Sequence, residues 1–225
     1  MSRAYCIPSV IILFCALVLS ILVSISLPFF PAMDITRIRI PSGFVATGEE
    51  GITQYRFGIW SACYYDTHET RSCLKTGHGY EVALQNGAMN AGVIIGSSWT
   101  TGLAIHPVAT AAIFVAFVLS FSSKAGVVLA ATLTAFLAAL LTLLAFAVDI
   151  ALYAWVKHQV GLLPDVNEEV VTSPAFWMTF VSLLLVLGAG CTMFIGRKKE
   201  RMAGATTYPA YSSSSKTSFW QRFKK

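Results

Sequence analysis

Charged residues are scarce in this chain. Only 12% of its 225 residues are charged, about half of the roughly 25% that a soluble domain carries, and 56% are hydrophobic. A soluble domain with so little charge would lack the polar surface that keeps it in water. The composition therefore predicts a membrane protein.

The sequence motifs of common catalytic and metal sites are also missing. There is no phosphate-binding loop, no Gly-x-Ser-x-Gly, no histidine-rich metal spacing and no acid–base pair of carboxylates on a soluble scaffold. No apolar run carries the regular charges of a voltage sensor or an ion-coupled pump. We therefore expect neither an enzyme nor a protein that holds a cofactor or metal, and no nucleic-acid or small-molecule partner.

Cysteines are few, and three of the five lie in apolar runs or directly beside one. Of the five, only Cys63 and Cys73 lie in a polar segment. This placement favours one disulfide in an oxidising compartment over a disulfide framework or a zinc site. The loop that it closes could staple a small domain, or it could bind a partner or sense a signal, and these roles are compatible.

Four apolar runs are long enough to cross a membrane as helices: 7–27, 103–121, 127–148 and 175–195. The first exceeds the apolar core of a signal peptide and has no clear cleavage site after it. The helical pattern of the third continues to residue 156. In hydrocarbon, backbone N–H and C=O groups must form hydrogen bonds with each other, because no water is present. The sequence therefore predicts an all-α membrane part, a bundle of four helices.

The remaining segments begin with a short N-terminus (1–6). Two loops, 28–102 and 149–174, lie on one side of the membrane, and a turn (122–126) and a tail (196–225) lie on the other. The first loop alternates apolar and polar residues over 35–40 and is aromatic over 55–60, which predicts a small β-sheet. Residues 81–89 are expected to form a short helix that leads back to the bilayer.

Positive charge is concentrated after the last run, beginning at Arg197, Lys198 and Lys199. The tail from there holds eight basic residues and one acidic residue. By the positive-inside rule the tail and the N-terminus are cytoplasmic, and the cysteine-containing loop is external. Basic residues interleaved with aromatic ones suggest contact with the inner leaflet, although a solubilising tail is the alternative. The residues expected at the leaflet are Arg197, Lys198, Lys199, Arg201, Trp220, Arg222, Lys224 and Lys225.

Titratable residues in unusual places are further candidates. His68 lies inside the cysteine loop and His78 just after it, so either could respond to ambient pH, although solvated loop residues are the simpler interpretation. Asp149 interrupts the third apolar run, and a carboxylate inside a membrane is a functional candidate. Helical rise places it near the external end of that run, where it could equally be a helix-end residue. His106 and His158 are its possible partners.

Several motifs resemble a known family. Gly58 and Trp60, followed by Cys63 and Cys73, resemble the signature of the claudin-like four-span superfamily. The stretches Leu103-Ala104-Ile105-His106-Pro107 and Val148-Asp149-Ile150 are similar to those of the fungal PalI family, which is related to the Sur-type proteins. The resemblance covers residues 7–196.

The resemblance implies a multi-pass protein of the fungal plasma membrane with a small extracellular β-rich domain. PalI-type members assist alkaline-pH sensing beside a seven-span sensor, which launches proteolytic activation of a zinc-finger transcription factor. Sur-type members organise membrane domains and influence endocytosis and the cell wall. A channel auxiliary subunit or a claudin-like adhesion protein is a weaker alternative. The implied partners are the lipid bilayer and either the sensor or a second copy of the chain.

Overall fold

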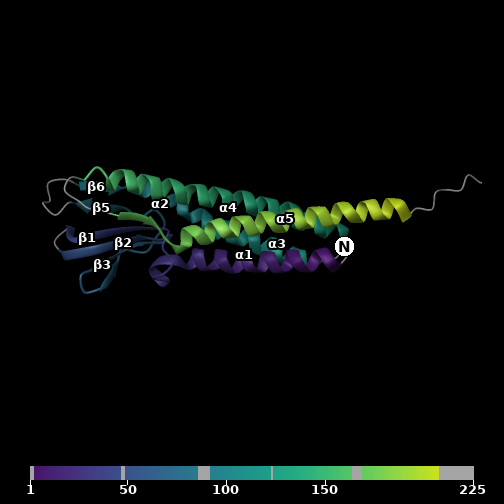
Figure 1. Cartoon of the computed structure of the whole chain (residues 1–225), viewed down its shortest axis with the longest axis horizontal. Helices are drawn as coiled ribbons and strands as arrows, with labels where there is room; N and C mark the ends of the chain where they lie inside the picture. Colours follow the sequence, from purple (N-terminus) through teal and green to yellow (C-terminus); the bar gives the residue numbers. More distant parts are fainter. Residues whose placement is uncertain (1–2, 47–48, 86–91, 123, 164–168, 208–225) are drawn as a thin grey trace, which may run out of the picture.

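The computed structural model describes residues 3–46, 49–85, 92–122, 124–163 and 169–207. A bundle of long helices carries a small sheet at one end, and Figure 1 shows the N-terminus at the other. The helices are α1 (Arg3–Phe29), α2 (Ser97–Thr101), the 3₁₀ turn η1 (Gly102–Ala104), α3 (Ile105–Ser120), α4 (Ala125–Val160) and α5 (Pro174–Thr207). The strands are β1 (Thr36–Ala46), β2 (Glu49–Phe57), β3 (Ala62–Asp66), β4 (Arg71–Cys73), β5 (Val82–Gln85), β6 (Gly92–Ile95) and β7 (Glu169–Thr172).

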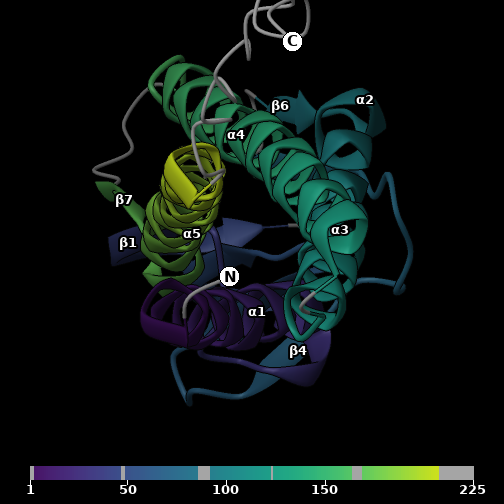
Figure 2. The same cartoon turned by 90° about the vertical axis from the view of Figure 1, so that its right-hand side faces the viewer.

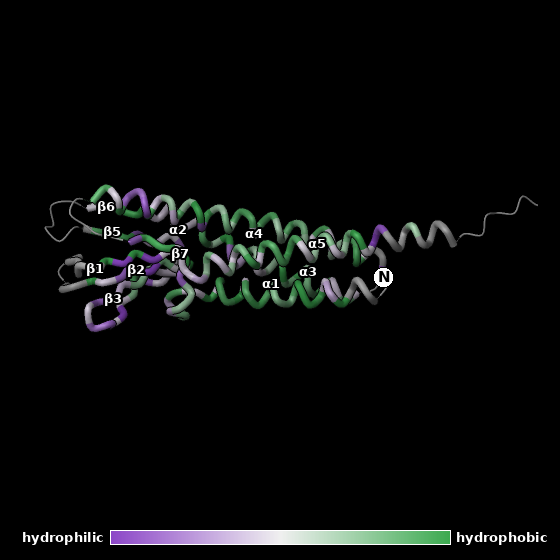
Figure 3. Tube along the Cα trace, in the orientation of Figure 1, coloured by the Kyte–Doolittle hydropathy of each residue, from purple (hydrophilic) through white to green (hydrophobic). Residues whose placement is uncertain are grey.

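Four helical segments among the described residues are long and apolar enough to span a membrane: Ile7–Phe29, Ser97–Ser120, Gly126–Val160 and Pro174–Lys198. This confirms the four-helix membrane fold. Figure 3 shows their hydrophobic character against the more polar sheet. Large apolar side chains such as Leu133 and Phe194 lie exposed on the outside, while alanines such as Ala135 and Ala189 are buried. Small buried residues let membrane helices pack closely, and the exposed apolar ones suit lipid.

The helices form a closed ring when the bundle is viewed along its axis (Figure 2). α1 packs against α3 and α5, and α4 packs against the same two helices. Each helix therefore has two neighbours inside the protein and an outer face that remains for lipid.

The sheet is antiparallel, with strand order β4-β3-β2-β1-β7. On β1, Ile38 and Ile40 are buried and Arg39 is exposed, so the predicted alternation places one apolar face inward. That face joins a core that includes Val23 of α1 and Leu152 of α4. β7 comes from the second loop and pairs with β1, so the two predicted loops build one domain.

The short helix predicted over residues 81–89 is wrong where the structure describes it. Val82–Gln85 is strand β5, which pairs with β6 in a separate two-stranded sheet. Val82 and Leu84 are buried while Glu81 and Ala83 are exposed, and this period of two is that of a strand. Residues 86–89 lie outside the described part of the chain. The third membrane helix also runs four residues beyond its predicted extension, to Val160.

Candidate functional site

The site begins where α1 unwinds at the sheet end of the bundle. In a regular helix the N–H of residue 28 would bond to the carbonyl of Ser24, but Pro28 has no N–H. The backbone leaves helical geometry at Ser26 (φ −20°, ψ −158°) and Leu27 (φ −55°, ψ 141°). The last turn of α1 therefore exposes a main-chain acceptor that needs another donor.

That donor comes from the loop signature that contains Gly58, Ile59 and Trp60. Trp60 Nε1 donates a 2.7 Å hydrogen bond to the main-chain oxygen of Ser24. The N–H of Ile59 donates a 2.8 Å bond to the hydroxyl of Ser26, which is buried. Two adjacent residues of the signature are thus bonded to the unwound end of α1, and they fasten the sheet to the bundle.

Gly58 allows the signature to lie this close to the helix. A Cβ atom on Gly58 would be 2.5 Å from Leu27 Cβ and 2.9 Å from the Leu27 nitrogen, closer than real atoms approach. The carbonyl of Gly58 also accepts a 2.7 Å bond from the buried hydroxyl of Tyr80. The glycine at this position is required by close backbone approach rather than by an unusual backbone angle.

A disulfide joins Cys63 and Cys73, which are directly opposed on β3 and β4. The Ser61 hydroxyl donates to the Leu74 carbonyl at 2.8 Å. The N–H of Gly77 donates to the Trp60 carbonyl at 2.8 Å. The segment that follows the disulfide is therefore held against the signature, as expected of a covalent staple in a small domain.

A hydroxyl network continues from Ser24 into the bundle. Thr110 of α3 donates from its hydroxyl to the carbonyl of His106 at 2.9 Å. Because that hydroxyl has one proton and two lone pairs, it can accept from the hydroxyls of Ser20 and Ser24 of α1, which lie 2.5 and 2.7 Å away. Ser24 thus joins Trp60 through its carbonyl to Thr110 through its hydroxyl.

The network ends at a buried pair between α3 and α4. His106 Nε2 lies 3.0 Å from Asp149 Oδ1, and the two residues are 5% and 0% exposed. The second carboxylate oxygen, Oδ2, has no hydrogen-bond partner among the described residues. Removing one member of a buried pair leaves the other polar group unmatched in an apolar surrounding, which makes such a pair sensitive to mutation.

The structure selects His106 from the two candidate partners of Asp149. His158 is exposed, and its ring centroid lies 6.2 Å from that of Trp155. Asp149 lies within α4, eleven residues before its end at Val160, so it is not a helix-end residue. Pro107 occupies the first turn of α3, where a missing N–H is tolerated.

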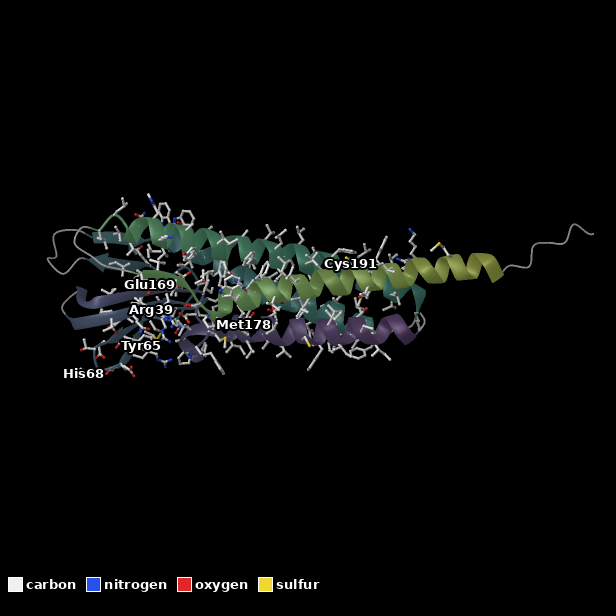
Figure 4. The ribbon with its side chains drawn as sticks, viewed as in Figure 1. Arg39, Tyr65, His68, Glu169, Met178 and Cys191 are labelled. Atoms are coloured by element: carbon white, nitrogen blue, oxygen red, sulfur yellow. A yellow bond between two sulfur atoms is a disulfide. The ribbon has the colours of Figure 1, made fainter. Side chains whose placement is uncertain are left out.

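The two histidines of the first loop, His68 and His78, lie apart from this network. His68 and His78 are exposed, and Figure 4 labels His68 at the tip of the β3–β4 hairpin, far from the helices. The main-chain N–H groups of His68 and Thr70 both donate to Asp66 Oδ1. The bond from Thr70, as the largest favourable contribution, lowers the pKa of the Asp66 carboxyl. The described residues contain no group of three His, Cys, Asp or Glu side chains that could hold a metal.

The predicted leaflet contacts are described only in part. Arg197 is half-buried and Lys198 is exposed, both on the last part of α5. Lys199 and Arg201 continue the same helix. Trp220, Arg222, Lys224 and Lys225 lie outside the described residues.

Sequence reasoning missed a buried carboxylate that ties the two loops together. Asp34 is fully buried and accepts two bonds from Arg37, at 2.9 and 3.0 Å, and one of 2.8 Å from the hydroxyl of Ser173. It joins the start of β1 to the start of α5. No local sequence signal pairs residues 139 positions apart. The roles of Ser24 and Ser26 were also missed, although Pro28 four residues after Ser24 signals a free carbonyl.

Comparison with known proteins matches this architecture to one family. A search of the curated proteins found no match. The model of the SUR7/PalI family matches residues 5–194, which contain the signature, the disulfide, the buried pair, three of the spans and most of the fourth, Pro174–Lys198. The chain therefore belongs to the SUR7/PalI family.

Proposed function

We propose that this protein is a non-enzymatic regulatory subunit of the plasma membrane that assists the sensing of ambient alkaline pH. In this proposal the sheet is extracellular and both termini are cytoplasmic, as the basic residues after the fourth span favour. The bundle packs against the helices of a seven-span sensor, and the sheet faces the surroundings. Membership of the SUR7/PalI family supports the proposal.

The observation that carries the proposal is a path of hydrogen bonds from the sheet into the half of the bundle that lies next to it. It runs from Trp60 through Ser24 and Thr110 to His106 and Asp149. In a sensor subunit, an event outside the membrane must change the position or conformation of the membrane helices. The polar groups of this path have few alternative hydrogen-bond partners in an apolar bundle. A displacement of the residues at one end is therefore coupled to the residues at the other end.

The proposal is tested in a fungal strain from which the gene has been deleted. After an alkaline shift, processing of the pH-responsive transcription factor is measured with and without the gene. We expect processing to be lost in the deletion strain and the seven-span sensor to co-purify with the tagged protein. Normal processing in that strain would exclude the proposed role.

One observation favours a second candidate, a structural organiser of plasma-membrane domains. Gly188 of α5 is partly exposed, and a Cβ atom there would meet nothing within 4 Å. Glycine on an outer helix face lets a second membrane helix approach closely. This function predicts patches in the membrane and oligomers in native gels that Gly188→Leu disrupts, and a uniformly distributed monomer would contradict it.

A further inference from the structure

Exposed aromatic side chains surround the bundle where it meets the sheet. Phe29 and Phe30 at the end of α1 are 69% and 47% exposed, and Trp177 lies exposed in the first turn of α5. Trp99 is 36% exposed and stacks on the partly buried Trp155, with ring centroids 4.5 Å apart. Aromatic residues gather at this depth because their rings suit the boundary between hydrocarbon and headgroups. Exposed aromatic residues at this end of the apolar spans are expected near one membrane surface.

Two arginines of the sheet hold the backbone on either side of the phenylalanine pair. Arg71 Nη1 donates to the carbonyl of Pro28 at 3.2 Å, and Arg56 Nη1 donates to the carbonyl of Pro31 at 3.0 Å. The turn that carries Phe29 and Phe30 is therefore fixed from the sheet side, and both side chains remain exposed.

The two guanidinium groups differ in how many of their donors are used. Arg56 also donates to Gln54 Oε1 from Nε and Nη2, and its Cζ lies 4.2 Å from the centroid of the Tyr65 ring. Arg71 is exposed, and among the described residues it makes one side-chain hydrogen bond, the one to Pro28. Most of the five donors of Arg71 therefore remain for a ligand outside the protein.

The position of the Phe29–Phe30 turn and the charge of Arg71 together indicate which ligand this surface binds. The Phe29–Phe30 turn continues the lipid-facing side of α1, where Ile21 and Ile25 are exposed. A guanidinium just outside an aromatic ring lies at the depth of phospholipid phosphates, which its planar fork binds well. The acidic residues Asp66 and Glu69 belong to the hairpin tip around His68, which Figure 4 shows farther from the bundle.

We propose that the Phe29–Phe30 turn and Arg71 form a lipid-docking surface that seats the sheet on the adjacent leaflet. The two rings enter the boundary of the hydrocarbon, and the Arg71 guanidinium binds the phosphate group of a phospholipid while it holds the Pro28 carbonyl. The occupant is a bilayer phospholipid. The surface does not depend on which side of the membrane the sheet occupies or on the proposed role in pH sensing.

The guanidinium contact is tested by solid-state NMR of the full-length protein in phosphatidylcholine bilayers. With ¹³C-arginine, ³¹P dephasing of the Cζ signals reports which guanidinium groups lie beside lipid phosphates. Arg71→Gln should remove one dephased signal. Arg39→Gln is the control, because Arg39 is exposed on β1, with Nη1 3.9 Å from Glu169 Oε2 of the edge strand β7, and β4 with Arg71 is the opposite edge of the sheet. This change should remove no dephased signal. Unchanged dephasing in folded Arg71→Gln would overturn the proposal.

A second measurement does not require Arg71 to be replaced. Nitroxide is attached at Phe30→Cys in a variant without Cys6, Cys15 and Cys191, and its collisions with oxygen and with a water-soluble nickel complex are compared. Ile94→Cys is the control, because Ile94 is equally apolar and 59% exposed but lies on β6. Oxygen should dominate at position 30 and nickel at position 94. Equal accessibility to nickel at both positions would place the turn in water and contradict the proposal.

Discussion

Trp60 donates its indole N–H to the main-chain oxygen of Ser24, and this is the oxygen that Pro28 leaves without a helical donor. One residue at the end of the first span therefore creates the acceptor, and the loop signature satisfies it. The contact links the tryptophan of the polar loop to the effect of the proline near the end of the first span. It also gives the sheet a fixed position on the bundle.

Trp60→Phe keeps an aromatic ring and removes this donor. We expect the free energy of unfolding in detergent to fall by about 1–2 kcal/mol, because the Ser24 carbonyl loses its partner in a partly buried place. Trp177→Phe, an exposed site on α5, is the control and should change stability by less than about 0.5 kcal/mol. Equal effects of the two changes would mean that the Trp60 bond adds nothing to stability.

Gly58→Ala introduces a Cβ atom where Leu27 already lies, with contacts of 2.5 Å to a side-chain atom and 2.9 Å to backbone. Backbone cannot yield as a flexible side chain can, so the free energy of unfolding of the variant should fall by at least about 2 kcal/mol, or the variant should fail to reach the membrane in which the wild-type protein resides. Gly77→Ala, in the same loop with nothing within 4 Å, should be tolerated. Thermal unfolding and localisation measure both, and a stable Gly58→Ala would contradict the close contact.

The buried pair is tested by a double-mutant cycle. His106→Ala and Asp149→Ala should each lower the free energy of unfolding. In the double variant the decrease should be about 1–3 kcal/mol smaller than the sum of the two single decreases. The exposed His158→Ala should behave as wild type to within about 0.5 kcal/mol. Strict additivity of the two single changes in unfolding experiments would show that the contact contributes no coupling energy.

Stability at alkaline pH should depend on Tyr80. Burial raises the pKa of its hydroxyl far above the usual value of about 10. In the unfolded chain Tyr80 ionises near pH 10 while the folded protein keeps it protonated, so its contribution is complete below about pH 10 and falls as pH rises further. Tyr80→Phe should flatten this part of the curve of unfolding free energy against pH. An identical alkaline slope in both proteins would be evidence against the buried, protonated hydroxyl.

Parts of the fold were predictable because their signals are local. Apolar runs identify the spans, and alternation identifies β1 around Ile38. The helix expected over 81–89 was wrong over Val82–Gln85, because the period of two that buries Val82 and Leu84 covers only four residues. Such a short pattern is weak until β6 pairs with it.

The candidate site was predictable to a smaller extent. The disulfide follows from two nearby cysteines in a polar segment. The pairing of His106 with Asp149 depends on how α3 packs against α4, since 43 positions separate them and His158 is nearer in sequence. The hydrogen bond from Trp60 to Ser24 joins the first loop to the first membrane helix. Its acceptor is a main-chain oxygen, so no pattern of side chains in the sequence reveals it.

The most direct test of the account is to break the path from sheet to bundle at its middle. Thr110→Val removes the hydroxyl that joins Ser24 to His106 and keeps the shape of the side chain. Thr134→Val is the matched control, because among the residues that the structure describes its hydroxyl bonds within α4, to the Ala130 carbonyl. The deletion strain is complemented with each variant, and transcription-factor processing is measured after an alkaline shift.

We expect Thr110→Val to reach the plasma membrane and to restore little processing, whereas Thr134→Val restores it fully. Full processing with Thr110→Val, in a strain where deletion abolishes it, would contradict transmission through this path.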